Sequence, residues 1–228
     1  KTIARSARHC ANAQRMSEGL ARKLFNQVVN ETDHTLNLSK LCALETNKQS
    51  LVIRQWFKAK QLRMPSEKVV LGIINQVINA KESSTPEIKG LGYSIRRYRE
   101  KLFCLKPNKI LDVKNLLWSK GVQVIEINDN SKLSLFESMQ GIPKGIWADA
   151  EVEVKFRQGA EKISLPGRKG RHSLKKLYQE KGIPPWQRNS IPLIYLDGHL
   201  AAVANLWISA DYFSQKQAAC YQIDWIMP

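Results

Sequence analysis

The hydrophobic period of this chain changes at a polar connector, residues 81–86 (KESSTP), and this change limits the folds that the chain can adopt. Before the connector, apolar residues recur every three or four positions, as in helices that pack on one face. Beyond it, apolar and polar residues alternate over short runs, as in half-buried strands. We therefore predict a helical part followed by an α+β part with an antiparallel sheet.

The first segment, residues 1–29, predicts a long amphipathic helix. Residues 30–39 are polar and predict a loop with a short extended piece. The apolar stripe of the helix consists of Ile3, Ala7, Cys10, Ala13, Leu20, Leu24 and Val28. Its opposite side carries cations that either face solvent or contact RNA, namely Arg5, Arg8, Arg15, Arg22 and Lys23.

Two further helices are predicted over residues 45–60 and 67–80, separated by Met64-Pro65-Ser66. Proline interrupts a helix, and serine is a good cap for the next one. Gly72 indicates close packing against a neighbour, and Trp56 lies on an apolar stripe, so we expect it in the core rather than stacked on a base. The expected inner positions are Leu51, Val52, Gln55 and Trp56 in one helix and Val70, Ile73, Ile74, Val77 and Ile78 in the other.

Residues 93–98 and 102–105 predict a small β-hairpin that turns near Glu100. The run Arg96-Arg97-Tyr98-Arg99 interleaves cations with an aromatic ring, a composition suited to phosphates and a stacked base. The same composition fits an edge strand that its charges protect from aggregation. The sequence leaves both interpretations open.

Lys106-Pro107-Asn108 is the predicted boundary between a helical domain, residues 1–106, and an α+β domain, residues 107–228. Asp197-Gly198 is a strong signal for a two-residue hairpin turn between strands at residues 194–196 and 200–203. Other strands are expected at residues 122–127, 133–136, 152–156 and 163–165 and along Tyr221, Ile223 and Trp225, with a loop at residues 141–145 (GIPKG). The second domain is thus predicted to be α+β, an antiparallel sheet with at least one packed helix.

That packed helix is predicted over residues 173–181. Leu174, Leu177 and Tyr178 form its apolar stripe, at spacings i, i+3 and i+4. Ser173 is a suitable N-cap, and Gly182 can adopt the left-handed conformation that ends many helices. Flexible glycines, cations and the positive end of the helix meet just before it, and all three favour a bound phosphate there. A solvated basic turn before an ordinary surface helix is the alternative, which the high total charge of the chain weakens.

The charge balance supports a polyanionic partner. Lys and Arg number 36 against 20 Asp and Glu, a net charge of +16, which favours nucleic acid first and an anionic membrane surface second. Ten cations and two carboxylates lie between residues 155 and 188. The candidate phosphate contacts are Arg168, Lys169, Arg171, Lys175, Lys176, Lys181 and Arg188 in this stretch, with Arg96, Arg97 and Arg99 upstream.

The sequence lacks the patterns of a membrane protein, a nucleotide-binding protein or an enzyme active site. No apolar run approaches the length of a membrane span, and neither a glycine-rich nucleotide loop nor a catalytic constellation is recognisable. We expect no metal or cofactor in this chain, because its four cysteines, Cys10, Cys42, Cys104 and Cys220, lack zinc-site spacing. They indicate small buried residues of a cytoplasmic protein. The chain starts without Met inside a helical pattern, so we expect a piece of a longer protein.

Two other classes of function remain open. A non-catalytic interaction or dimerisation module, including a homodimer, would carry its charge incidentally. A basic DNA-binding regulator would normally show a helix-turn-helix pair or a basic zipper, and neither pattern is present.

The stretch from residue 167 to residue 195 resembles the C-terminal domain of tRNA(Ile)-lysidine synthetases. The helices, the break at residues 64–66 and the hairpin upstream resemble the central substrate-recognition domain of the same family. At Gly159-Ala160-Glu161 the chain departs from the family, whose members often have two glycines there. The matching residues are Gly167-Arg168-Lys169-Gly170-Arg171, Leu174-Lys175-Lys176-Leu177, Gln179-Glu180, Gly182-Ile183-Pro184-Pro185-Trp186, Arg188 and Pro192-Leu193-Ile194-Tyr195.

This resemblance implies a parent enzyme that adenylates the wobble cytidine in the CAU anticodon of tRNA(Ile). Lysine then displaces AMP, which gives lysidine and changes codon reading from AUG to AUA. The family's N-terminal domain binds ATP with Mg²⁺ through a Ser-Gly-Gly-x-Asp-Ser loop, and no such loop occurs in this sequence. The resemblance therefore implies a tRNA-holding chain, inactive by itself, whose C-terminal domain meets the acceptor stem. Trp186 would stack on a base or pack at a hinge.

Overall fold

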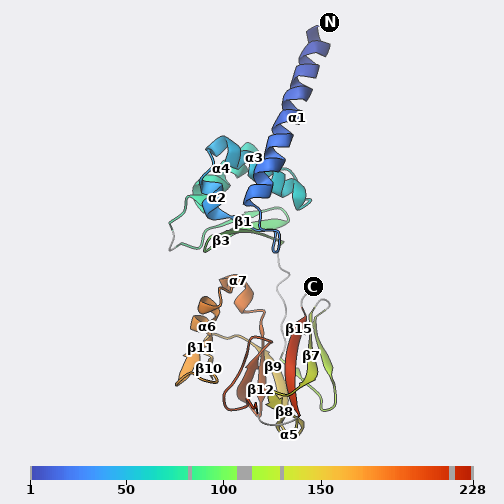
Figure 1. Ribbon diagram of the computed structural model, residues 1–228, viewed down its shortest axis with the longest axis vertical. Helices are drawn as coiled ribbons and strands as arrows, with labels where there is room; N and C mark the ends of the chain where they lie inside the picture. Colours follow the sequence, from blue (N-terminus) through green and yellow to red (C-terminus); the bar gives the residue numbers. More distant parts are fainter. Residues whose placement is uncertain (1, 82–83, 107–114, 129–130, 216–218, 227–228) are drawn as a thin grey trace. The chain divides into compact units, whose positions relative to one another are not determined.

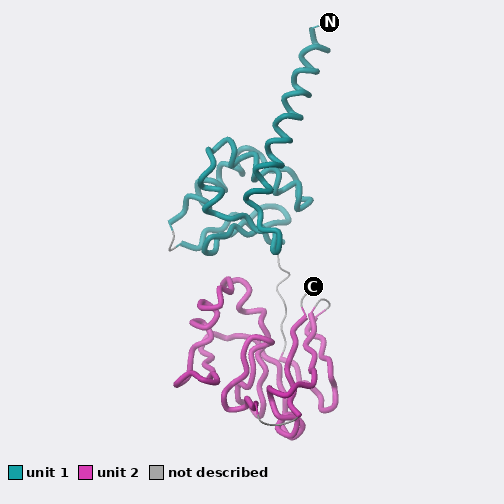
Figure 2. Tube along the Cα trace, viewed as in Figure 1, with its two compact units in different colours: residues 1–109 teal, residues 110–228 magenta. Residues whose placement is uncertain are grey.

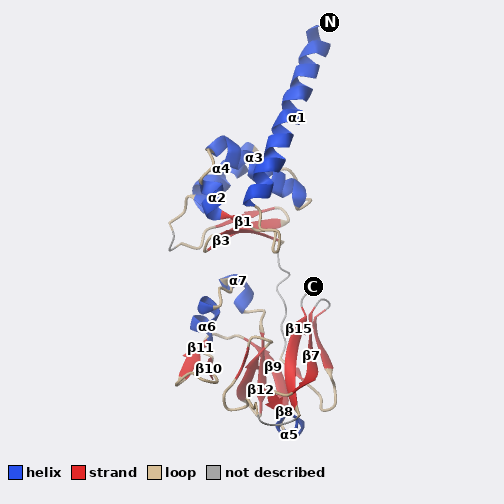
Figure 3. Ribbon diagram, viewed as in Figure 1, coloured by secondary structure: helices blue, strands red, loops and turns tan. Residues whose placement is uncertain are grey.

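The computed structural model divides the chain into two compact units, Lys1–Lys109 and Ile110–Pro228 (Figure 2). It describes residues 2–81, 84–106, 115–128, 131–215 and 219–226. The boundary expected between residues 106 and 107 lies three residues before this division. The composition is mixed, with a helical region first and antiparallel sheets with short helices after it (Figure 3).

The helices of unit 1 are α1 (Thr2–Val28), α2 (Leu38–Cys42), α3 (Thr46–Ala59) and α4 (Glu67–Gly72), which continues into the π-helix η1 (Ile73–Ile78). The three long helical segments predicted from the sequence are confirmed. The short helix α2 was missed, because its N-cap Asn37 and its few residues resemble a polar loop. Asn37 accepts a hydrogen bond from the Lys40 amide at 2.9 Å.

Helix α1 is only partly packed. Its buried residues are Ala21, Leu24 and Val28, whereas Ile3 is 87% exposed and Leu20 is 43% exposed. The N-terminal part of α1 extends away from the rest of unit 1 (Figure 1). The predicted apolar stripe is therefore covered only in its last third, because periodicity identifies an apolar face but not what covers it.

The inner face of α4 and η1 is confirmed at all five predicted positions, which are 0–2% exposed. The Ser66 hydroxyl caps α4 by accepting from the Val69 amide at 3.4 Å. In α3 the inner face differs from the prediction, because Ile53 and Phe57 are fully buried while Leu51 and Gln55 are only half-buried. Trp56 is 1% exposed, and its Nε1 donates to the His34 carbonyl at 3.0 Å.

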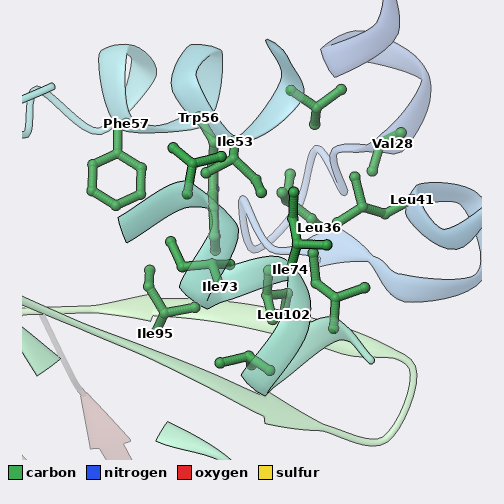
Figure 4. Close-up of a cluster of buried hydrophobic side chains, with 14 of the residues drawn as sticks. Val28, Leu36, Leu41, Ile53, Trp56, Phe57, Ile73, Ile74, Ile95 and Leu102 are labelled. Atoms are coloured by element: carbon green, nitrogen blue, oxygen red, sulfur yellow. The ribbon is translucent and has the colours of Figure 1, made fainter. Parts of the chain in front are cut away.

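These helices pack on a four-stranded antiparallel sheet with the order β1-β4-β3-β2. Its strands are β1 (Leu36–Asn37), β2 (Glu87–Gly90), β3 (Tyr93–Tyr98) and β4 (Lys101–Leu105). The predicted hairpin is β3 with β4. Strand β1 is the short extended piece expected within residues 30–39, whereas β2 was not predicted. Apolar side chains such as Trp56, Ile73 and Ile95 fill the space between helices and sheet (Figure 4). At Gly72, a Cβ would lie 3.6 Å from Ile88 of β2.

Unit 2 contains a five-stranded sheet, β14-β13-β12-β9-β5, a four-stranded sheet, β6-β7-β15-β8, and the two-stranded ribbon β10-β11. Its strands are β5 (Leu116–Leu117), β6 (Val124–Asn128), β7 (Ser131–Ser138), β8 (Ile142–Pro143), β9 (Val152–Phe156), β10 (Lys162–Ser164), β11 (Arg171–Ser173), β12 (Pro192–Leu196), β13 (His199–Val203), β14 (Trp207–Ile208) and β15 (Cys220–Ile226). Its helices are α5 (Lys144–Asp149), α6 (Leu174–Glu180) and α7 (Pro185–Arg188). The predicted α+β character, with antiparallel strands and at least one packed helix, is confirmed, whereas the division of the described strands into two larger sheets and a ribbon was not predicted.

Strand β12 shows how these layers are built. Ile194 and Leu196 belong to the apolar core shared with the four-stranded sheet, whereas Leu193 and Tyr195 belong to the core under α6. Successive side chains of a strand point to opposite faces, so the five-stranded sheet has a core on each side. In Figure 1, the ribbon β10-β11 and α6 lie on the opposite side of β12 from β7 and β15.

In unit 2 the hairpin turn predicted from the sequence is confirmed, whereas the predicted loop is not. Asp197 (φ 47°) and Gly198 (φ 77°) form the two-residue turn between β12 and β13. The loop expected at residues 141–145 is wrong, because Ile142 and Pro143 form β8 and α5 begins at Lys144.

The expectation of buried cysteines holds for Cys220, whereas Cys104 is half-buried and Cys10 and Cys42 are exposed.

Candidate nucleic-acid interface

The basic stretch of the sequence folds into the ribbon β10-β11 followed directly by α6. The Lys162 end of β10 pairs with the Ser173 end of β11, so α6 starts beside the beginning of the ribbon. The loop between the two strands turns through Gly167 (φ 76°) and Gly170 (φ 78°), a backbone conformation that favours glycine. The exposed cations on this ribbon and helix, which we call the basic surface, are Lys162, Arg168, Lys169, Arg171, Lys175, Lys176 and Lys181.

Helix α6 presents two of these cations because its other side is anchored. Leu174, Leu177 and Tyr178 are 0–1% exposed, which confirms the predicted stripe. Lys175 and Lys176 therefore point away from the core and are exposed. The positive end of the helix adds little, because α6 has seven residues and the Ser173 hydroxyl already accepts from the Lys176 amide at 3.4 Å.

Three other cations of the basic surface have contacts at its edge. The Arg168 guanidinium binds Glu180 at 2.9 Å, a hydrogen bond that holds the pKa of the Glu180 carboxyl below its usual value. The Lys181 ammonium lies 5.6 Å from the ring centroid of Trp207. Arg171 donates to the Lys162 carbonyl at 3.2 Å. Such exposed contacts are weak, so these side chains can exchange them for a phosphate.

Arg188 is not part of the basic surface, although it was predicted to contact phosphate with the other cations of this stretch. It is 5% exposed, and its Nε donates to the Ile183 carbonyl at 2.9 Å. Its charge therefore braces the turn between α6 and α7 rather than adding to the basic surface. Trp186, in the first turn of α7, is half-buried.

Lys155 and Arg157, which the sequence places near the same cluster, are also held within unit 2. The Lys155 ammonium binds Glu153 at 2.6 Å and lies 5.0 Å from the ring centroid of Tyr195. Arg157 lies 3.7 Å from the Glu161 carboxylate. Burial acts to raise the pKa of Glu161, but amide donors at residues 158 and 159 and the charge of Arg157 outweigh it and lower that pKa.

The upstream arginines separate into different environments. The edge-strand interpretation of this run is wrong, because β3 pairs with both β2 and β4. Arg96 binds Glu87 at 2.7 Å. Arg97 donates to the carbonyls of Ile78 and Ala80, at 3.1 and 2.7 Å. Arg99 is exposed in the turn, with its guanidinium 5.6 Å from the Tyr98 ring centroid.

The remaining described residues provide little for other chemistry. Nowhere among them do three or more His, Cys, Asp or Glu side chains gather as a metal site would require. None of the helices in the same residues has both the length and the apolar character needed to cross a bilayer.

Comparison with known proteins finds matches for both units of the chain. Residues 36–103 match the family model described as "TilS substrate binding domain", and residues 152–225 match "TilS substrate C-terminal domain". The tRNA(Ile)-lysidine synthase of Legionella pneumophila (strain Paris) is 34% identical over 224 residues, which are 97% of this chain and 50% of that protein. That of Methylococcus capsulatus is 28% identical over 226 residues, 98% of this chain and 52% of that protein.

The chain thus spans about half the length of the curated relatives that it matches. A solved structure titled "Crystal structure of TILS C-terminal domain" matches 50% of this chain and 98% of that chain. Its TM-score is 0.41 at 18% sequence identity.

Proposed function

Since this chain belongs to the TilS family, the tRNA(Ile)-lysidine synthases, we propose that it is the tRNA-binding part of such an enzyme. In this proposal the complete enzyme uses ATP to attach lysine to the wobble cytidine of tRNA(Ile) with a CAU anticodon. The product, lysidine, changes codon reading from AUG to AUA. ATP, Mg²⁺ and lysine are bound outside this chain, which holds and orients the tRNA.

The observation that carries the proposal is the basic surface, because it lies within the segment that matches the TilS C-terminal domain. Seven exposed cations gather there on a ribbon and one helix, while Glu180 is the acidic residue of the same helix. Backbone phosphates are the ligands that such a surface attracts most strongly.

The arrangement favours orientation of the RNA over reading of its sequence. Lys169, Lys175 and Lys176 are long, exposed side chains suited to phosphate oxygens. Two units on one chain let the protein contact separate parts of one folded RNA, which is how structured RNA is commonly recognised. Arg99 of unit 1 is exposed and suited to a phosphate. Arg96 and Arg97 are less exposed, and a phosphate would have to replace Glu87 or the carbonyls of Ile78 and Ala80.

The proposal is tested by the affinity of the full chain for tRNA(Ile) with a CAU anticodon, measured across a series of salt concentrations. The test variant is Lys175→Ala/Lys176→Ala. Each lost phosphate contact should reduce the slope of log K against log [salt] by about 0.7–0.9, so the double variant should lose about 1.4–1.8. Its fold should persist, because both side chains are exposed.

The matched control is Lys120→Ala/Lys132→Ala, which removes the same charge from exposed positions near and on the four-stranded sheet. The control should keep the wild-type slope. Equal losses of slope in both variants would show that only net charge matters. Absence of binding by the wild-type chain would refute the proposal and favour the interaction module.

A further inference from the structure

A cavity of about 410 Å³ lies in unit 2 at the edge of the basic surface. Its wall comes from the loop before β11, the turn from β13 into β14, Phe213 and strand β15. Its volume is within the roughly 300–1,000 Å³ of sites that bind small organic groups. The cavity is therefore large enough for a nucleotide, but not for a base-paired helix.

Aromatic rings supply part of the wall. Trp207 and Phe213 both line the cavity and are half-buried. Two groups outside the cavity wall hold Trp207 in position. The Tyr178 ring lies 5.6 Å from it between ring centroids, and the Lys181 ammonium lies over its ring. A ring already fixed by its neighbours loses little conformational freedom when a base stacks on it.

Polar groups stand beside these rings. Asn205 lies exposed in the tight turn between β13 and β14, in which the Leu206 amide donates to the Val203 carbonyl at 2.8 Å. An Asn side chain offers both a donor and an acceptor, as recognition of the edge of a base requires. Gln222 of β15 adds a second amide side chain to the wall.

Arg168 joins the cavity to the basic surface, because it belongs to both. Its present partner, Glu180, is 43% exposed and Arg168 itself is 51% exposed, so water competes strongly with their ion pair. A phosphate bound near the mouth of the cavity could replace Glu180 at little cost. The cavity thus combines stacking rings, amide side chains and a phosphate-binding cation.

We propose that this cavity binds one unpaired nucleotide of the RNA, with its base against Trp207 and Phe213, its edge toward Asn205 and its phosphate on Arg168. Bases available for such binding occur in single-stranded RNA, since paired bases are stacked within the helix. The inference rests on the proposed function, because it assumes that RNA occupies the basic surface.

The test compares two RNA hairpins with the same stem, one blunt and one with a short single-stranded extension, made with the extension at either end. Affinities for the full chain are measured by fluorescence anisotropy. Stacking of one base is worth ~1–3 kcal/mol, so the wild-type chain should bind an extended hairpin at least about fivefold more tightly than the blunt one.

Two variants locate this preference. Phe213→Leu keeps an apolar side chain but removes an aromatic face, and Asn205→Ala removes an exposed amide; each should lower the preference toward equal binding. Asn189→Ala, at an exposed position outside the cavity, should keep it. Equal binding of blunt and extended hairpins by the wild type, or an unchanged preference in both cavity variants, would overturn the inference while leaving the proposed function intact. If neither hairpin binds while tRNA(Ile) does, the inference is overturned and the proposed function stands; failure to bind tRNA(Ile) as well would overturn both.

Discussion

Arg97 offers a direct test of whether an arginine in the predicted RNA-binding run stabilises the fold instead. One guanidinium nitrogen donates to the carbonyls of Ile78 and Ala80, at and just beyond the end of η1, where a positive charge is favourable. The substitution Arg97→Met keeps the apolar stem of the side chain and removes both donors. We expect unit 1 to lose stability, because the carbonyl of the buried residue Ile78 would be left without this donor.

The size of the loss follows from the two bonds. A hydrogen bond with a charged partner contributes about 1.5–3 kcal/mol, and one to an exposed carbonyl contributes less because water replaces it. Ile78 is 2% exposed while Ala80 is half-exposed, so the first bond dominates. We therefore expect a loss of about 2 kcal/mol, which corresponds to a roughly 30-fold change in an opening equilibrium.

Hydrogen exchange followed by mass spectrometry suits this measurement, because it reports on α3 and η1 separately from unit 2. Peptides from both helices should exchange about 30-fold faster in Arg97→Met when opening is at equilibrium. Arg99→Met removes the same charge from the exposed turn and should cost less than about 1 kcal/mol. Unchanged protection in Arg97→Met, together with weaker RNA binding, would refute the structural role and assign this guanidinium to RNA.

Two further substitutions test local features of unit 2. Gly182→Ala places a Cβ on a backbone with φ 75°, so hydrogen exchange should show that α6 is less stable by about 1–2 kcal/mol. Gly145→Ala lies within α5 with open space at its Cβ, so it should stabilise α5 by about 0.5–1 kcal/mol. Equal effects of the two substitutions would contradict the left-handed end of α6. Glu161→Gln tests the lowered pKa of the Glu161 carboxyl. The ionised carboxylate stabilises the fold fully at pH values above 4.5, the usual pKa of a glutamate, and this stabilisation is lost as the pH falls through the lower pKa of the folded state. Urea unfolding should therefore show a wild-type advantage at pH 7 that shrinks toward pH 3, and a constant difference would contradict the lowered pKa.

Caps and turns were predictable because they depend on a few neighbouring residues. Ser173, Gly182 and Asp197-Gly198 perform the roles that their residue types favour. The π-helix η1 was not predictable, since its sequence has ordinary helical periodicity. The Asn79 amide donates to the Ile74 carbonyl at 3.0 Å, and nothing in the spacing of apolar residues distinguishes this bond from an α-helical one.

The candidate site was predicted as a region but not residue by residue. The sequence analysis named seven candidate cations between residues 168 and 188, and all of these are exposed in the structure except Arg188. Lys162 also belongs to the basic surface, because β10 pairs with β11. No local sequence pattern predicts this pairing. The cavity beside them was missed altogether, since it combines segments from residue 165 to residue 223.

The sequence by itself determined the change from helical to strand periodicity at residues 81–86, the ends of α6, the β12–β13 turn and the strong positive charge. Each of these depends on composition or on residues a few positions apart. Only the tertiary structure decided which cations reach solvent and which bind their own chain, as Arg97 and Arg188 do. The physical reason is that burial and partner choice depend on segments distant in sequence, whereas a charged side chain has the same local pattern in either role.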